Sequence, residues 1–324
     1  MRIFWYLVCL SVAVFATDFD FVKAYRQGGI QAIENAVHKQ LMSYDYWLNS
    51  LSQNDIRFGY YESVKFVFVA DKKESTLKLF DINEAHQLTE KYSNNALMGS
   101  KPGDKLVEGD LKTPIGAYDL TTKLTKLDQF YGPLAYVTSY PNLYDRLQNK
   151  TGYGIWIHGL PFNGDREINT RGCIAIDNTQ LLNIDKEMNI KNAILITGDG
   201  NLTEMTKEQA ANILSGLFQW RNAWEKNDFE TYIAFYDKNQ FKRFDKMKFN
   251  DFKDYKRRIF SKNESKTIEF KTINISPYPN EKGEQFFRIS FYEKYRASGG
   301  YRFEGNKELY ARLQNNKLQI VAER

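Results

Sequence analysis

Residues 155–176 restrict the fold of this chain more than any other stretch. Two short apolar segments, 155–157 and 174–176, lie on either side of a polar loop. Apolar alternation over so few positions is typical of β-strands rather than of helices. His158 follows the first segment and Cys173 precedes the second. The sequence therefore predicts two strands that bring an imidazole and a thiol to the two ends of one loop.

The amino-terminal segment has the features of a secretory signal. Arg2 supplies a positive start, residues 3–15 form an apolar run, and a small residue, Ala16, ends it. We expect cleavage after Ala16 and a periplasmic mature protein. An N-terminal membrane anchor is the alternative, but the run is shorter than the ~20 residues that span a bilayer. A lipid on Cys9 is disfavoured because the preceding Val8 is bulky.

Removal of this signal would leave Cys173 as the only cysteine of the mature chain, because Cys9 is the other of the two. The mature protein could then form no internal disulfide, and packing must stabilise it. A buried, inert cysteine is common. The neighbours of Cys173 favour a reactive one: Gly172 permits a tight turn, and Arg171 adds a positive charge that would favour the thiolate.

Apolar residues at helical spacing follow two consecutive glycines near the start of the mature chain. They are Ile30, Ile33, Val37, Leu41, Tyr44, Leu48 and Leu51. Spacings of three and four place them on one helix face. Four of them are also seven apart, which fits either a homodimer formed through this helix or a helix packed on its own chain.

At Lys65 the apolar period changes from helical spacing to two. Segments 66–69 and 76–80 predict paired strands across a polar turn at 71–74. Further strands are expected at 113–118, 155–158 and 193–197.

Two connections in this strand-rich region have features of their own. Asn178 is expected to cap a short helix that runs through Met188. The connection from 124 to 151 is long and rich in tyrosine. We expect it to form either a lid over a site or a plain surface insertion.

Residues 203–324 predict a compact α+β module, with helices first and an antiparallel sheet from Thr267. Trp220 and Trp224 are expected in its core. Residues 217–324 hold 23 Lys and Arg against 15 Asp and Glu, whereas the remainder holds 22 against 25. Such a basic surface favours an anionic polymer or serves solubility. No nucleic-acid partner is expected for an exported protein.

The chemistry that Cys173 needs is represented nearby in the sequence. A cysteine nucleophile requires a base, a group that orients the base, and N–H donors for an oxyanion. His158 is the candidate base, while His38 and His86, the other histidines, lie in a helix and a polar segment. With three histidines and no His-Glu-x-x-His pattern, no metal site and no cofactor are expected.

These residues resemble the YkuD-type L,D-transpeptidase catalytic domain. Its pattern is His-Gly, followed some fifteen residues later by Ser/Thr-His-Gly-Cys-Ile/Val-Arg/Asn. Here the pattern stands as His158-Gly159 and, over 170–175, Thr-Arg-Gly-Cys-Ile-Ala. Residues 109–116, Gly-Asp-Leu-Lys-Thr-Pro-Ile-Gly, are similar to the Thr-Pro-x-Gly segment of the family. The resemblance covers about residues 65–200.

The resemblance implies a role for each matching residue. Cys173 would be the nucleophile and His158 its base, oriented by the backbone carbonyl of Gly159. The N–H groups of Gly172 and Cys173 would line the oxyanion hole. The substrate would be the peptidoglycan stem peptide, cut between the L centre of the diamino acid at position three and the D-alanine at position four. Substrate binding is assigned to Arg171, Thr170, Trp156 and Tyr131.

Two departures from the family pattern leave the acceptor open. Arg171 replaces the second histidine, and Ala175 replaces the Arg or Asn. An amine acceptor would make the protein an L,D-transpeptidase that forms 3-3 cross-links. Water would make it an L,D-carboxypeptidase that trims tetrapeptides to tripeptides, which we favour. A non-catalytic wall-binding scaffold is the third hypothesis.

The layout of the whole chain is similar to the L,D-carboxypeptidases that set helical cell shape in epsilonproteobacteria. It implies an α+β protein with a signal peptide at 1–16, a helical region at 17–62, a YkuD-like catalytic domain at 63–202 and an NTF2-like domain at 203–324. The pocket of the last domain would hold wall glycan or stem peptide.

Overall fold

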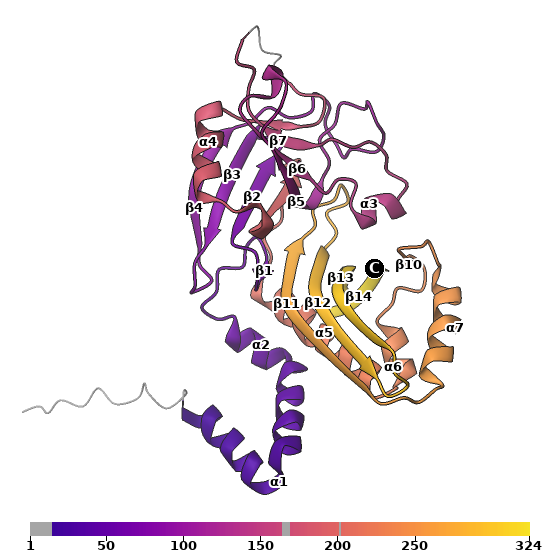
Figure 1. Ribbon diagram of the computed structural model, residues 1–324. Coiled ribbons are helices and arrows are strands. Elements are labelled where there is room, and N and C mark those ends of the chain that lie inside the picture. The colour runs from indigo at the N-terminus through magenta and orange to yellow at the C-terminus, as the bar shows by residue number, and fades with distance from the viewer. Residues whose placement is uncertain (1–14, 164–168, 201) are drawn as a thin grey trace, which may run out of the picture.

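The computed structural model describes residues 15–163, 169–200 and 202–324. The expected signal segment lies outside this range except for its last two positions. Figure 1 shows a helical N-terminal arm, a strand-rich central domain and a C-terminal domain in which a curved sheet faces helices. Among the described residues, no helix combines the length and apolarity that crossing a membrane requires.

The N-terminal arm consists of α1 (Phe15–Leu41) and α2 (Tyr44–Ser50). α1 is interrupted at Gly29, whose φ of +65° is a left-handed conformation that glycine adopts without strain. The expectation of one continuous apolar stripe is wrong, because the chain turns between the two helices. Ile30, at the start of that stripe, is 67% exposed, whereas Leu51, at its end, is 1% exposed in the C-terminal core.

The central domain is built on an eight-stranded sheet with the order β4-β3-β2-β9-β5-β6-β7-β8. The predicted hairpin is confirmed: β2 and β3 pair antiparallel, with Phe66 opposite Asp81 and Asp71 opposite Thr76. The other expected strands correspond to β5, β7 and β9. The strand bounds are β2 (Phe66–Asp71), β3 (Thr76–Ile82), β4 (Leu88–Asn95), β5 (Gly116–Leu124), β6 (Ala135–Thr138), β7 (Trp156–His158), β8 (Ile174–Ala175) and β9 (Ala193–Gly198).

The aromatic connection at 124–151 is an integral part of the domain rather than a surface insertion, and its residues Phe130 and Tyr131 border the site cavity. It contributes η1 (Gln129–Tyr131), strand β6 and α3 (Leu143–Leu147). Tyr136 and Tyr140 are 0% and 5% exposed, respectively. The tyrosines are numerous here because several of them fill the interior, which the polar residues between them concealed in the sequence.

The short helix after the second site strand is confirmed as α4 (Asn178–Glu187), followed by η2 (Ile190–Asn192). Its cap differs from the expectation. The side chain of Asp177 accepts the N–H groups of Thr179 and Gln180, so Asp177 is the N-cap. Asn178 is the first helical residue, and its side chain is free to bind elsewhere.

The C-terminal domain has the predicted order of helices followed by an antiparallel sheet. The sheet order is β1-β11-β12-β13-β14-β10. Trp220 is fully buried, as expected. The bounds are α5 (Lys207–Glu225), α6 (Phe229–Ala234), β10 (Lys242–Arg243), α7 (Phe249–Phe260), β11 (Lys266–Pro277), β12 (Phe286–Ala297), β13 (Arg302–Gln314) and β14 (Lys317–Glu323), and β1 (Tyr60–Tyr61) joins this sheet from the N-terminal side.

The central and C-terminal domains share a buried interface. Val67 and Ile196 of the central sheet belong to the same apolar cluster as Tyr310 of β13. Beside it, the guanidinium of Arg288 binds the carboxylate of Asp119 through two nitrogens at 2.8 and 2.5 Å. This interface joins the catalytic sheet to the C-terminal domain through both apolar packing and an ion pair.

Candidate active site

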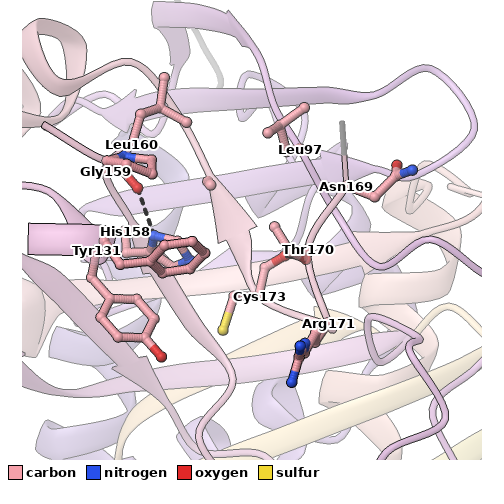
Figure 2. A pocket seen from close by; sticks show the side chains of 12 residues that line it. Leu97, Tyr131, His158, Gly159, Leu160, Asn169, Thr170, Arg171 and Cys173 are labelled. Atoms are coloured by element: carbon pink, nitrogen blue, oxygen red, sulfur yellow. Dashed lines mark hydrogen bonds between the residues drawn. The ribbon is translucent and has the colours of Figure 1, made fainter. Parts of the chain in front are cut away.

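Strands β7 and β8 place the two predicted catalytic side chains on one face. They pair in parallel, with Ile157 opposite Ile174 and His158 opposite Ala175. Successive side chains of a strand point to opposite faces. The two isoleucines therefore enter the core, where both are fully buried, while His158 and Cys173 face the same cavity (Figure 2).

The imidazole of His158 has a defined orientation. Its Nδ1 lies 2.6 Å from the backbone oxygen of Gly159. A carbonyl only accepts, so Nδ1 carries the proton and Nε2 is left as the basic nitrogen. Burial lowers the pKa of His158 below 6.5, and the Gly159 carbonyl opposes this shift in part. The imidazole is therefore neutral and able to accept a proton near pH 7.

The thiol of Cys173 rests in its protonated form. Its Sγ donates to the backbone oxygen of Gly154 at 3.3 Å. Burial raises the pKa of Cys173 above 9.0, and the N–H of Trp156 and the charge of Lys105 oppose that shift. Arg171, which we expected to favour the thiolate, is exposed. The cation that acts on Cys173 is Lys105, whose side chain is only 4% exposed.

The turn before Cys173 is held by Thr170. Its Oγ1 accepts the N–H of Gly172 at 3.1 Å and donates to the backbone oxygen of Cys173 at 2.6 Å. Gly172 has φ +137°, and a Cβ there would lie 2.8 Å from the backbone oxygen of Lys112. This explains the glycine before the thiol. It also shows that the Gly172 N–H would have to leave or share Thr170 Oγ1 before it could bind an oxyanion.

The Thr-Pro-x-Gly segment lies directly under this turn. Thr113 is fully buried, and its Oγ1 accepts the N–H of Gly99 at 2.9 Å. Gly99 in turn forms a parallel bridge with Thr170. The segment therefore supports the Cys173 turn from the side of the core.

Tyr131, in η1, covers the imidazole. Its ring meets that of His158 edge to face, with centroids 5.2 Å apart, and that of Trp156 at 5.0 Å. Its backbone oxygen accepts the N–H of Gly159 at 3.0 Å. Tyr131 thus contacts the base through its ring, as Figure 2 shows, and the following residue, Gly159, through its main chain.

These residues line a cavity of about 350 Å³. Six of the predicted site residues border it: Tyr131, His158, Gly159, Thr170, Arg171 and Cys173. Gly172 and Trp156 are not among its lining residues, although Gly172 precedes Cys173 and the ring of Trp156 packs against that of Tyr131. Ala175, a position of the motif, also borders it, and the lining residues that the sequence did not indicate are Leu97, Phe130, Leu160, Pro161 and Asn169.

Leu97 shows why the sequence could not indicate every residue that lines the cavity. It is distant from the site in sequence and arrives through an antiparallel bridge with Ala175. No pattern of residues marks such a bridge. Within the described ranges, no group of three or more His, Cys, Asp or Glu side chains is arranged to hold a metal ion.

Comparisons with known proteins match both large domains. Residues 65–196 match the family model of the YkuD L,D-transpeptidase catalytic domain. Residues 212–324 match that of the Cds6 C-terminal NTF2-like domain. Together they confirm the predicted α+β organisation, with a strand-rich catalytic domain and an NTF2-like domain. No protein of curated function matches the chain.

Three solved structures are similar over most of the chain. The helical cell shape determining protein Pgp2 from Campylobacter jejuni is 41% identical, with a TM-score of 0.82 over 87% of this chain and 99% of that chain. A point variant of it gives a TM-score of 0.83 at 41% identity, over 88% and 99%. Bd1075 from Bdellovibrio bacteriovorus is 25% identical, with a TM-score of 0.65 over 83% and 96%.

Proposed function

We propose that this chain, which belongs to the family of the helical cell shape determining protein Pgp2, is a peptidoglycan L,D-carboxypeptidase that contributes to cell shape. It would remove the terminal D-alanine of tetrapeptide stems. One observation carries the proposal: the imidazole of His158, whose Nδ1 is bound by the Gly159 carbonyl, and the thiol of Cys173 face one cavity at the paired strands β7 and β8.

The first half of the reaction forms a thioester. His158 Nε2 takes the thiol proton as Sγ of Cys173 attacks the carbonyl carbon of the residue at position three. The oxyanion would be met by the N–H of Cys173 and, once Thr170 releases it, that of Gly172. As the tetrahedral intermediate collapses, the carbon–nitrogen bond breaks, and the imidazolium gives its proton to the departing D-alanine amine.

The second half releases the tripeptide. Water replaces D-alanine in the cavity, and His158 Nε2 accepts a proton as the water oxygen attacks the thioester. The carbon–sulfur bond breaks, the thiolate recovers the proton from the imidazolium, and a new carboxylate leaves. Tyr131, Thr170 and Arg171 border the cavity in which the stem would lie, and Trp156 supports the ring of Tyr131.

Digestion of purified tetrapeptide muropeptides in H₂¹⁸O tests the acceptor directly. We expect equal amounts of tripeptide and D-alanine, with one ¹⁸O in the tripeptide carboxylate. Cys173→Ala and His158→Ala should abolish release, whereas His38→Ala, in α1 outside the catalytic domain, should not. New 3-3 cross-linked dimers would instead identify an L,D-transpeptidase. Absence of any product with retained binding to sacculi would identify a scaffold.

We further propose that the C-terminal domain binds wall glycan. A cavity of about 790 Å³ in this domain is bordered by aromatic rings, among them Trp224, Tyr295 and Tyr301. Trp224 Nε1 and Glu293 Oε2 are buried and have no hydrogen-bond partner among the described residues. A glycan could stack its sugar rings on these aromatic side chains and form hydrogen bonds with the unpartnered polar atoms.

Co-sedimentation with sacculi tests this second site. Tyr301→Ala should weaken binding several-fold, while Tyr46→Ala, an exposed tyrosine of α2 that borders neither cavity, should not. Unchanged sedimentation of Tyr301→Ala and Trp224→Phe would contradict glycan binding here.

Two further proposals concern the N-terminal region. Val22, Tyr25 and Ile30 are each more than half exposed on α1, and we propose that a second copy of the chain covers them. Light scattering should then report a dimer that Ile30→Asp dissociates.

The protein would be exported to the periplasm by its amino-terminal signal, and fractionation of cells that express chains with and without residues 1–16 would test this.

A further inference from the structure

We propose that Asn178 is a positioning residue of the active site, whose side-chain amide fixes the peptide plane between Gly159 and Leu160 and through it the imidazole of His158. Asn178 does not itself line the cavity. The inference deepens the proposed function, because it concerns how the base of that reaction is held.

The side-chain amide of Asn178 forms two hydrogen bonds with the backbone of Leu160, two residues after the base. The N–H of Leu160 donates to Asn178 Oδ1 at 2.7 Å. Asn178 Nδ2 donates to the backbone oxygen of Leu160 at 3.0 Å. Both polar groups of one residue are thus bound by one side chain, as they would be by a neighbouring strand.

The first of these bonds acts on the carbonyl that orients His158. The oxygen of Gly159 and the N–H of Leu160 belong to the same peptide unit, which is planar. One end of this unit receives Nδ1 of His158 at 2.6 Å, and the other end donates to Asn178. Fixing the N–H end therefore fixes the direction of the C=O end. Donation by the N–H also polarises the carbonyl and strengthens it as an acceptor.

The packing around Asn178 Oδ1 shows that this contact is built into the site. A Cβ added at Gly159 would lie 2.1 Å from that oxygen, and one added at Gly132 would lie 2.5 Å from it. The amide therefore occupies the space that a side chain at either position would need. The glycine of the His-Gly pair is required by the amide and by Pro133, whose Cδ would lie 2.8 Å from the same Cβ.

Asn178 is not the N-cap of its own helix, so a capping role does not explain its hydrogen bonds to Leu160. The N-cap of α4 is Asp177, which accepts the N–H groups of Thr179 and Gln180. Removal of the Asn178 amide leaves that cap intact. Asn178→Ala should therefore fold, and its effect should appear at His158.

Selective ¹⁵N labelling of histidine in the full chain gives a test that needs no substrate, since the chain has three histidines. In the wild type, His158 should show the Nδ1–H tautomer. Asn178→Ala should mix the tautomers and move the His158 titration to lower pH, because the Gly159 bond that raises its pKa is weakened. Asn178→Asp keeps an acceptor for the Leu160 N–H and should retain the tautomer.

Asn189→Ala is the matched control. Asn189 also accepts a backbone N–H at the start of a short helix, that of Lys191 at 3.1 Å, but it has no contact with the His-Gly segment. It should leave the His158 spectrum unchanged. An unchanged tautomer and titration in Asn178→Ala would overturn the proposal, and so would an equal change in Asn189→Ala.

The kinetics of D-alanine release provide a second test of the role of Asn178. Asn178→Ala should lower kcat by up to roughly 10²-fold, as misplacement of a catalytic group does, with little change in KM. Asn178→Asp should recover most of the loss. A purely structural defect would reduce the active fraction without moving the pH profile, and that result would also overturn the proposal. If the wild type released no D-alanine, the proposed function would fail, yet the spectra would still decide the role of Asn178.

Discussion

Gly159→Ala tests how closely catalysis depends on the packing behind the base. The added Cβ would lie 2.1 Å from Asn178 Oδ1 and 2.8 Å from Pro133 Cδ, where ordinary contact begins at 3.4 Å. The Cβ and Oδ1 must therefore separate by about 1.3 Å. The added Cβ cannot move far from these two atoms, because the Cα of Gly132 would lie 3.2 Å from it. Either the Asn178 amide must shift, which releases the Leu160 N–H, or the Gly159–Leu160 peptide must shift, and both displace the Gly159 carbonyl.

This shift has separate consequences for stability and for rate. Overpacking of this kind lowers the free energy of unfolding by about 1–3 kcal/mol. Moving the Gly159 carbonyl by about 1 Å breaks its contact with His158 Nδ1 and should lower kcat on the order of 10²-fold. Activity should therefore fall much further than the folded fraction, which stays near unity for a protein of ordinary stability.

The measurement pairs D-alanine release with urea unfolding. Gly283→Ala is the control, because Gly283 has φ +65° and no atom within 4 Å of its added Cβ. It should cost about 1–2 kcal/mol through backbone strain alone and leave kcat unchanged. Wild-type kcat in folded Gly159→Ala would refute the reasoning, because the imidazole would then not depend on this carbonyl.

Further predictions concern the charges of the site and of the domain interface. Alkylation of Cys173 by iodoacetamide should accelerate about tenfold per pH unit up to pH 9 without a plateau, since burial raises the thiol pKa above 9.0 and only the thiolate reacts; a plateau near neutrality would reveal an ion pair instead. Arg171→Ala should leave that profile unchanged, and a shift would restore the role that we first assigned to this arginine. The acid limb of kcat/KM should lie below pH 6.5, because burial lowers the pKa of His158 and the base is lost only when the imidazole is protonated; a limb above 6.5 would contradict it. Arg288→Ala should lower the free energy of unfolding by about 1.5–3 kcal/mol in urea titrations, since it removes the charged hydrogen bonds to Asp119 and Glu308; Asp119→Ala should cost less because the Asp119 side chain is 50% exposed and Arg288 keeps Glu308.

The sequence determined those features that local spacing encodes. The strand hairpin at β2 and β3, the strands beside His158 and Cys173, and the order of the C-terminal elements all follow from apolar periodicity, which depends only on neighbours in the chain. The His158 and Cys173 motif likewise identified the family. Predictions from local spacing were wrong where packing against distant parts of the chain decides the structure. The apolar residues from Ile30 to Leu51 are divided between two helices, and several tyrosines at 124–151 are buried in the core.

The tertiary structure alone decided how the site is held together. Leu97 reaches the cavity through a bridge to Ala175, and Lys105 rather than Arg171 supplies the charge near the thiol. Asn178, which the sequence suggested as a helix cap, binds Leu160 instead. These contacts join residues far apart in the chain, and their strength depends on burial and direction, which residue type and spacing do not encode. The motif therefore named the reacting groups, and the fold determined their protonation and orientation.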